Sequence, residues 1–323
     1  MSFELSLFIY LGLSATTAFV FWSSLMKAVR LVGTEKEQGF MYGLYYACNG
    51  LTSAFMNAFA LTAYGTAGGD VVDGFVRAVI AGGSIAVISA IALMILMKSP
   101  KGEEDTSLSD DETKFKLKDV GKVLKNPVVW VVSLTILCGY GIFSSTSYFN
   151  PYLTEVVGVT PESSGAITIV RNYLLLLLAP VGGIIADKLL KSTCKWLTIA
   201  FSILAVLFAI VLIMPSTISP LFASLYTLLP GAFAMMMYGV IFSTVSEAKI
   251  PRAFTGTVIG IASIIGYMPD SIYSLLFGNW LDAHGGAGYN YIFLFLAASA
   301  ALGAVLSIVI YRIGHKKEMS ENG

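Results

Sequence analysis

Apolar residues dominate this chain in long, nearly uncharged runs of about 20 residues, separated by short polar turns. A helix of that length crosses the hydrocarbon core of a bilayer. The pattern predicts nine membrane-spanning helices, with boundaries accurate to a few residues. Their ranges are 5–26, 39–64, 75–97, 127–149, 163–186, 196–214, 221–246, 254–277 and 289–311. The expected fold is all-α, a polytopic bundle of membrane helices.

A hydrophilic stretch, residues 98–126, interrupts this pattern and holds seven lysines and seven acidic residues. Such a composition is typical of a flexible linker. We therefore expect four parts in chain order. They are a partial N-terminal bundle of three helices (1–97), a cytoplasmic linker (98–126), a C-terminal bundle of six helices (127–314) and a cytoplasmic tail (315–323).

Two charged turns are each followed by a Gly-x-x-x-Gly helix start, at Gly39 and Gly43 and again at Gly256 and Gly260. Small residues at this spacing allow helices to approach closely, either as static packing or as a sliding contact. The two copies lie six predicted spans apart, which indicates two related halves. A six-helix repeat would place three further helices ahead of Met1.

Composition and charge placement support a membrane protein. Hydrophobic residues make up 56% of the chain and charged residues 12%, whereas soluble domains carry about 25% charged residues. Eighteen of the twenty lysines and arginines lie in alternate loops; only Arg77 lies on the opposite side, and Arg171 lies within a span. Because cytoplasmic loops are enriched in basic residues, the N-terminus is expected outside and the C-terminus in the cytoplasm.

The chemistry of enzymes has little support in this sequence. The three cysteines have no metal-binding or redox spacing, and no nucleotide-binding or hydrolase motif occurs. We expect no enzymatic activity, no cofactor, no metal site and no nucleic-acid partner. The expected partners are the lipid bilayer, a small-molecule substrate and a coupling ion.

Arg171 and Asp270 are the ionisable residues that stand out within spans. A charged arginine in lipid costs roughly 3 kcal/mol or more, so it should face a cavity or a partner. Each lies about eight residues from the outer end of its span, roughly 12 Å deep, so the two could pair. Arg171 is interpreted as an anion-binding residue and Asp270 as a coupling carboxylate; the alternative is a structural ion pair. Pro269 would loosen the helix beside Asp270.

Several segments together resemble the major facilitator superfamily, as its helices four to twelve. The stretch from Gly182-Gly183 through Asp187-Lys188 to Lys195 resembles the loop motif between family helices eight and nine, and 98–126 resembles the central loop. Further similar segments are Phe21-Trp22 with Lys27 and Arg30, Glu37-Gln38-Gly39, Tyr148 to Glu155, and Arg171-Asn172-Tyr173. The resemblance implies a secondary transporter that works by alternating access about a site near the membrane midplane.

A gate is expected at the cytoplasmic helix ends. A carboxylate at Asp187 can accept hydrogen bonds from the N-terminus of a neighbouring helix, and the resemblance implies that this motif latches the gate. The candidate partners of Asp187 are the helix opening near Gly256, together with Arg252 and Lys188. The remaining gate candidates are Lys188, Glu247, Arg252, Lys27 and Arg30; the last two also fit a role in membrane orientation alone.

Aromatic and amide side chains are the remaining candidates for contact with a solute. Tyrosine combines a flat apolar body with a hydroxyl group, which suits a small polar solute, although many such residues serve as interface belts or helix packing. The candidates are Tyr45, Tyr46, Asn49, Tyr140, Tyr148, Asn150, Asn172, Tyr173, Tyr238 and Tyr267.

These features predict a secondary active transporter in the bacterial inner membrane. It would move a small organic solute, with anionic solutes favoured by Arg171, coupled to protons through Asp270. The alternative is a non-transporting membrane sensor or scaffold, or an inactive truncated remnant.

Overall fold

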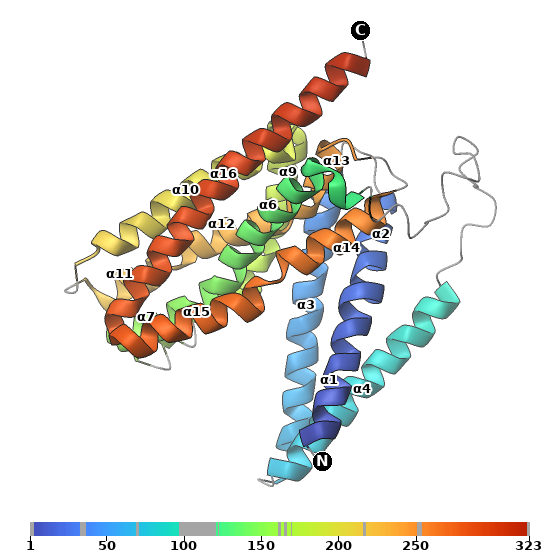
Figure 1. Cartoon of the computed structure of the whole chain (residues 1–323). Helices are drawn as coiled ribbons and strands as arrows, with labels where there is room; N and C mark the ends of the chain where they lie inside the picture. Colours follow the sequence, from blue (N-terminus) through green and yellow to red (C-terminus); the bar gives the residue numbers. More distant parts are fainter. Residues whose placement is uncertain are drawn as a thin grey trace. The chain divides into compact units, whose positions relative to one another are not determined.

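The computed structural model describes residues 3–32, 37–68, 71–96, 121, 123–160, 163–164, 167–168, 170–215, 218–250 and 254–321. Every regular element in these ranges is helical, as predicted (Figure 1). The chain divides into two compact units, Met1–Ala47 together with Phe115–Gly323, and Cys48–Lys114. The predicted domain boundaries near residues 97 and 126 lie largely outside the described residues and stay a prediction.

The larger unit opens with α1 (Phe3–Ala15), η1 (Thr16–Trp22), α2 (Ser23–Val32) and the first part of α3 (Gln38–Gly65). Its second segment contains α6 (Pro127–Ser145), η2 (Thr146–Tyr148), α7 (Phe149–Glu155), η3 (Val170–Leu174), η4 (Leu175–Leu178), α9 (Ala179–Ile184), η5 (Ile185–Leu189) and α10 (Thr193–Ile213). It continues with α11 (Pro220–Tyr226), α12 (Leu228–Tyr238), η6 (Ile241–Ser243), α13 (Thr244–Glu247), α14 (Thr255–Gly266), α15 (Pro269–His284), η8 (Gly285–Ala287) and α16 (Gly288–Glu321).

Six helical stretches in the described residues are long and apolar enough to cross a membrane. The last of them, Thr255–Lys316, spans 62 residues and covers both the eighth and the ninth predicted span. The first two predicted spans are also helical, over 3–32 and 38–65, although neither is among the six. Tyrosines and asparagines lower the hydropathy of α3.

The fifth predicted span is not a regular α-helix. It passes through a π-helical turn at η3, a 3₁₀ turn at η4, the short helix α9 and a second π-helical turn at η5. Arg171 lies in the first of these π-helical turns and Asp187 in the second. Such turns occur frequently at functional sites, because the extra residue redirects side chains and frees main-chain groups.

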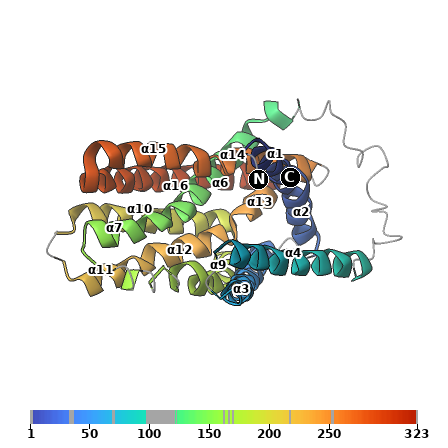
Figure 2. The same ribbon diagram turned by 90° about the horizontal axis from the view of Figure 1, so that it is seen from below.

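The core of the larger unit is aromatic. α10 runs along α16, and α15 packs beside α16 in both views (Figures 1 and 2). Phe149 stacks on Phe293 with ring centroids 5.1 Å apart, and Phe208 lies 6.0 Å from Phe149. All three rings are buried. Aromatic pairs contribute about 0.5–1.5 kcal/mol each beyond simple burial.

Glycines set how closely the start of α3 approaches α9. A Cβ atom added to Gly43 would lie 2.6 Å from the carbonyl oxygen of Ala179. A Cβ atom added to Gly183 would lie 2.5 Å from the carbonyl oxygen of Gly39. The first Gly-x-x-x-Gly pair therefore makes a main-chain contact that no larger residue permits.

The smaller unit contains the rest of α3 and α4 (Val71–Leu96). Arg77 forms a salt bridge with Asp73 at 2.7 Å and donates a hydrogen bond to the carbonyl oxygen of Thr66 at 3.0 Å. The rings of Phe55 and Phe59 stack 6.4 Å apart. Of these contacts, the hydrogen bond from Arg77 to Thr66 connects α4 to the turn that follows α3.

Replacing Gly43 with valine should destabilise the larger unit, because the added atoms overlap main-chain atoms that have no rotamer to change. Overpacking of this kind costs about 1–3 kcal/mol or more. Thermal unfolding of the purified protein in detergent measures the effect. Gly278→Val is the matched control, since a Cβ atom there meets nothing within 4 Å. Equal melting temperatures for the two variants would contradict the close contact.

Candidate functional site

Asp187 joins η5 to the first turn of α3. Its Oδ1 accepts a hydrogen bond from the N–H of Gly39 at 3.2 Å, and its Oδ2 accepts one from the N–H of Phe40 at 2.7 Å. The first N–H groups of a helix have no partner inside the helix, and the helix dipole favours a negative charge there. This contact, the Asp187 latch, connects residues 148 positions apart in the chain.

One predicted partner of Asp187, the helix opening near Gly256, was wrong; another, Arg252, lies outside the described residues. The sequence pattern pointed to the second charged turn, near Gly256, but the carboxylate bonds to the first copy of the pattern, at Gly39. The glycines at 39, 43 and 183 explain the choice, because they let the start of α3 come within reach of η5.

Glu247 forms a second contact of the same kind at the start of α10. Its Oε2 accepts a hydrogen bond from the N–H of Cys194 at 2.8 Å, and its Oε1 accepts a short one from the Ser192 hydroxyl. The same hydroxyl accepts a hydrogen bond from the N–H of Lys195 at 3.1 Å, so Ser192 caps the helix. Two helix starts are thus each held by a carboxylate from another segment.

The other gate candidates are less informative. Lys188 is exposed beside Asp187. The side chains of Lys27 and Arg30, and the whole of Arg252, lie outside the described residues.

Six aromatic side chains from both segments of the larger unit form a connected group, which we call the aromatic cluster. Its members are Trp22, Tyr45, Tyr46, Tyr140, Tyr238 and Tyr267. Ring centroids lie 4.3 Å apart for Tyr140 and Tyr267, 4.5 Å for Tyr46 and Tyr238, and 5.7 Å for Trp22 and Tyr267. Five of the predicted candidates are therefore brought together: Tyr45, Tyr46, Tyr140, Tyr238 and Tyr267.

The polar atoms of the aromatic cluster are buried and poorly satisfied. In the described residues, the indole N–H of Trp22 makes no hydrogen bond. The hydroxyls of Tyr46 and Tyr267 lie beside the Tyr238 hydroxyl, but without a hydrogen bond of ordinary geometry. A buried polar group in this state costs about 1–3 kcal/mol. The cluster therefore offers hydrogen-bonding groups that a polar ligand could satisfy.

Asp270 lies at one edge of the aromatic cluster. Its Oδ2 accepts a hydrogen bond from the Tyr140 hydroxyl at 2.7 Å. It also lines a cavity of about 280 Å³ together with hydroxyl side chains. These include Ser145, Tyr148 and Ser274. Pro269 starts α15 just before Asp270, which places the carboxylate in the first turn of a helix, where negative charge is favoured.

Arg171 is fully buried, with an exposed fraction of 0%. Its guanidinium donates to the Thr227 hydroxyl and to the Thr168 hydroxyl, each at 3.2 Å. It lies 5.7 Å from the centroid of the Phe149 ring. Its Nε has no hydrogen-bond partner in the described residues. Among the described residues, the partners of Arg171 are therefore hydroxyls and an aromatic face rather than an acidic side chain.

The pairing of Arg171 with Asp270, which their similar depth suggested, does not occur. Arg171 bonds to threonines and Asp270 to Tyr140, and no ion pair between them forms in the described residues. The chain between α6 and α7 separates them, since Tyr148 lines the cavity of Asp270 while Phe149 packs against Arg171.

The remaining candidates are scattered. Asn49 belongs to the smaller unit, where its Oδ1 accepts a hydrogen bond from the Ser53 hydroxyl at 3.2 Å. Tyr148 packs edge-on against Phe277, and Asn172 is half-buried. The side chain of Tyr173 lies outside the described residues.

The site candidates chosen from the sequence omitted Trp22, which completes the aromatic cluster, and Ser192, which shares a hydrogen bond with Glu247. Trp22 belongs to a segment that resembles a family motif, so a search for aromatic residues in that segment would have found it.

Comparison with known proteins places these features in a family. The family model of the Major Facilitator Superfamily matches residues 1–274. Inner membrane protein YihN of Escherichia coli K12 is 27% identical over 316 residues, which cover 97% of this chain and 75% of the relative. Inner membrane protein YqcE of the same organism is 26% identical, covering 92% of this chain and 70% of the relative. The Mycoplasma pneumoniae protein named uncharacterized protein MG294 homolog is 24% identical, covering 79% and 58%.

Replacing Glu247 with alanine should expose Cys194, which is fully buried at the start of α10. Hydrogen bonds to a charged group contribute about 1.5–3 kcal/mol, so losing two of them should raise local opening, and labelling by a maleimide, at least about tenfold. Peptide mass spectrometry in a Cys48→Ser background gives the labelling rate. Asp282→Ala is the control, because Asp282 is exposed at the other end of the unit. Unchanged labelling would show that Glu247 does not hold this helix start.

Proposed function

Because the chain belongs to the major facilitator superfamily, a family of membrane transporters, we propose that it moves a small organic solute across the bacterial inner membrane by alternating access. It is a multi-pass, all-α membrane protein. The names of two relatives as inner membrane proteins support the location.

The observation that carries the proposal is the hydrogen bond between Tyr140 and Asp270 at the edge of the aromatic cluster. The cluster combines residues that precede the linker, such as Trp22 and Tyr45, with residues that follow it, such as Tyr238. A carrier binds its solute between the elements that later separate. Flat rings with unsatisfied polar atoms suit a small organic molecule with a few hydrogen-bonding groups.

Asp270 is the proposed coupling residue. An ionisable side chain within a membrane span is expensive to keep and usually serves transport. Its Oδ2 accepts from the Tyr140 hydroxyl, so proton binding at the carboxylate would alter a contact that reaches directly into the aromatic cluster. Proton occupancy and solute occupancy would then depend on one another through Tyr140.

Arg171 favours an anionic solute. Its guanidinium is buried and pairs with no acidic side chain in the described part of the chain. A buried charge is normally paired or hydrogen-bonded throughout, and here one N–H group is left over. We propose that the solute supplies the missing negative charge when the surrounding helices open.

The proposed gate is the Asp187 latch, with Glu247 holding the neighbouring helix start. In the described conformation the latch is formed. By the distribution of basic residues this end faces the cytoplasm, so the conformation is one in which the cytoplasmic side is closed. Opening to the cytoplasm would require both hydrogen bonds to Asp187 to break.

A membrane sensor or scaffold remains the competing function. It would keep the aromatic cluster as packing and would not move a solute. Accumulation of any solute by proteoliposomes that contain the chain excludes this alternative.

Replacing Asp270 with asparagine should abolish solute-driven proton movement but leave exchange of labelled solute across the membrane. The amide keeps the shape of the carboxylate but cannot take up a proton. Proteoliposomes with a pH-sensitive dye inside, challenged with a panel of small carboxylates and neutral solutes, report the first quantity, and counterflow reports the second. Asp282→Asn is the control for an exposed acid. Proton movement unchanged in Asp270→Asn would remove the coupling role.

Replacing Arg171 with glutamine should abolish uptake of an anionic solute while the protein still reaches the membrane. The amide keeps a polar, hydrogen-bonding side chain at this position but lacks the positive charge. Removing one partner of a buried charge pair costs about 3–5 kcal/mol, because the other charge is left unpaired. Uptake of an anionic solute should therefore fall by at least about a hundredfold. Uptake and membrane abundance are measured together. If Arg171→Gln transports normally, the arginine is structural and the solute need not be anionic.

A further inference from the structure

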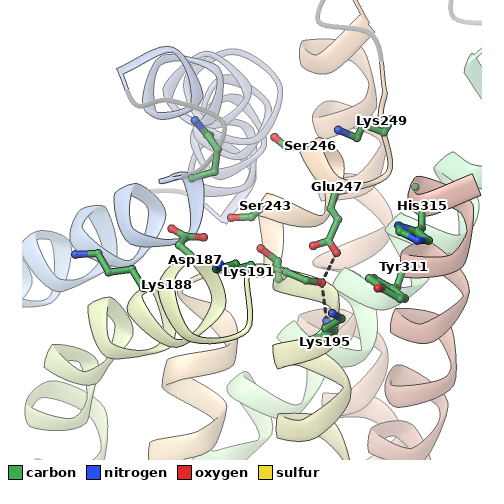
Figure 3. Close-up of a pocket in the computed structure, with 14 residues that line it drawn as sticks. Asp187, Lys188, Lys191, Lys195, Ser243, Ser246, Glu247, Lys249, Tyr311 and His315 are labelled. Atoms are coloured by element: carbon green, nitrogen blue, oxygen red, sulfur yellow. Dashed lines mark hydrogen bonds between the residues drawn. The ribbon is translucent and has the colours of Figure 1, made fainter. Parts of the chain in front are cut away.

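A cavity of about 760 Å³ lies at the helix ends that carry the Asp187 latch and Glu247. η5, the start of α10, the end of α13 and the C-terminal part of α16 contribute to it (Figure 3). Sites for small ligands commonly have volumes of roughly 300–1,000 Å³. The proposed transport mechanism leaves this cavity without a role.

The cavity is rich in positive charge. Lys188, Lys191, Lys195 and Lys249 line it, together with His315. The two carboxylates in its wall, Asp187 and Glu247, already accept hydrogen bonds from helix starts. Lys195 also lies over the ring of Tyr311, with its Nζ 5.0 Å from the centroid. Even without Lys249, the ammonium groups of Lys188, Lys191 and Lys195 outnumber the two carboxylates of the wall, which leaves an excess of positive charge.

Ser243 is a second and independent indication of a ligand. It lines the cavity, it has an exposed fraction of 2%, and its Oγ has no hydrogen-bond partner in the described residues. Figure 3 shows its hydroxyl beside the space between Asp187 and Glu247. Buried hydroxyls are normally satisfied, so this one is available to an oxygen atom of a bound molecule.

The backbone conformation of two lysines in the cavity wall is also unusual. Lys191 and Lys249 both have a φ of 51°, and among the described non-glycine residues only these two have positive φ. Each follows the end of a helical turn, and the N–H of Ser192 bonds back to the carbonyl oxygen of Ala186, as in a helix C-cap. Glycine is the usual residue at such a position. The two lysines occupy it at a conformational cost and both line the cavity.

We propose that this cavity binds a phosphoryl group, carried either by a soluble phosphate compound or by a lipid headgroup. A phosphate carries a charge near −2 and three terminal oxygens, so it can meet several lysines at once, whereas a carboxylate offers less charge and fewer acceptors. Lysine is a common point-charge binder of phosphate. Lys191 follows η5, which carries Asp187, and Lys249 follows α13, which carries Glu247. A phosphoryl group bound to both lysines would therefore connect these two elements.

Such a ligand would stabilise the closed latch, because it would hold together the two segments that carry the carboxylates. Its site is separate from the aromatic cluster, so binding and transport can be measured independently. Failure of one proposal leaves the other intact.

The test is equilibrium binding of radiolabelled pyrophosphate to the full chain in nanodiscs of phosphatidylcholine, repeated with phosphatidic acid as a competitor in the lipid. The variants are Lys191→Gly with Lys195→Gln, and Ser243→Ala. Lys191→Gly relieves the unfavourable backbone conformation, so its melting temperature should equal or exceed that of the parent protein. Lys316→Gln is the control, because it removes one charge beside His315 without belonging to the cavity wall.

We expect saturable binding that weakens at least tenfold in the double lysine variant and several-fold in Ser243→Ala, with no change in Lys316→Gln. If phosphatidic acid competes with pyrophosphate, the cavity also accepts the phosphoryl group of a lipid headgroup. If phosphatidic acid does not compete, the ligand is a soluble phosphate compound. If neither pyrophosphate nor phosphatidic acid binds saturably, or if Lys316→Gln weakens binding as much as the double variant, the site does not exist.

Discussion

The contact between the Asp187 carboxylate and the first amides of α3 is the constraint on which the larger unit depends. The amides at a helix start need acceptors, and a carboxylate satisfies two of them while matching the helix dipole. The carboxylate reaches them only because Gly43 and Gly183 let main chains touch. The loop motif and the glycine pair are therefore two parts of a single device, and neither has its effect without the other.

The polar groups inside the helices are arranged around hydroxyls. Arg171 is held by Thr168 and Thr227, and Asp270 by Tyr140. A direct ion pair would cancel both charges and leave nothing for a solute or a proton to change. Separate hydroxyl partners keep each group hydrogen-bonded, and no oppositely charged side chain in the described part of the chain pairs with either of them. That arrangement costs stability and is understandable where charge has a role in transport.

Much of the fold could be predicted because the bilayer fixes the length of an apolar helix. The sixth span was predicted at 196–214 and is found as Thr193–Ile213. The π-helical turns at Arg171 and Asp187 could not be predicted, since tertiary packing produces them and the local sequence remains helix-compatible. The partner of Asp187 was missed for a related reason. Two helix starts share one local pattern, and only packing against α9 selects the first.

The strength of the latch also fits the proposed cycle. Two hydrogen bonds to a carboxylate contribute about 1.5–3 kcal/mol each, so the latch accounts for roughly 3–6 kcal/mol of preference for the closed end. Reversing a two-state equilibrium from 1:99 to 99:1 takes about 5.5 kcal/mol of differential binding. A solute that binds with micromolar affinity has a total binding free energy of about 8 kcal/mol, which is larger than this difference. The latch is therefore strong enough to define the closed state, and a solute that binds the open state more tightly is able to release it.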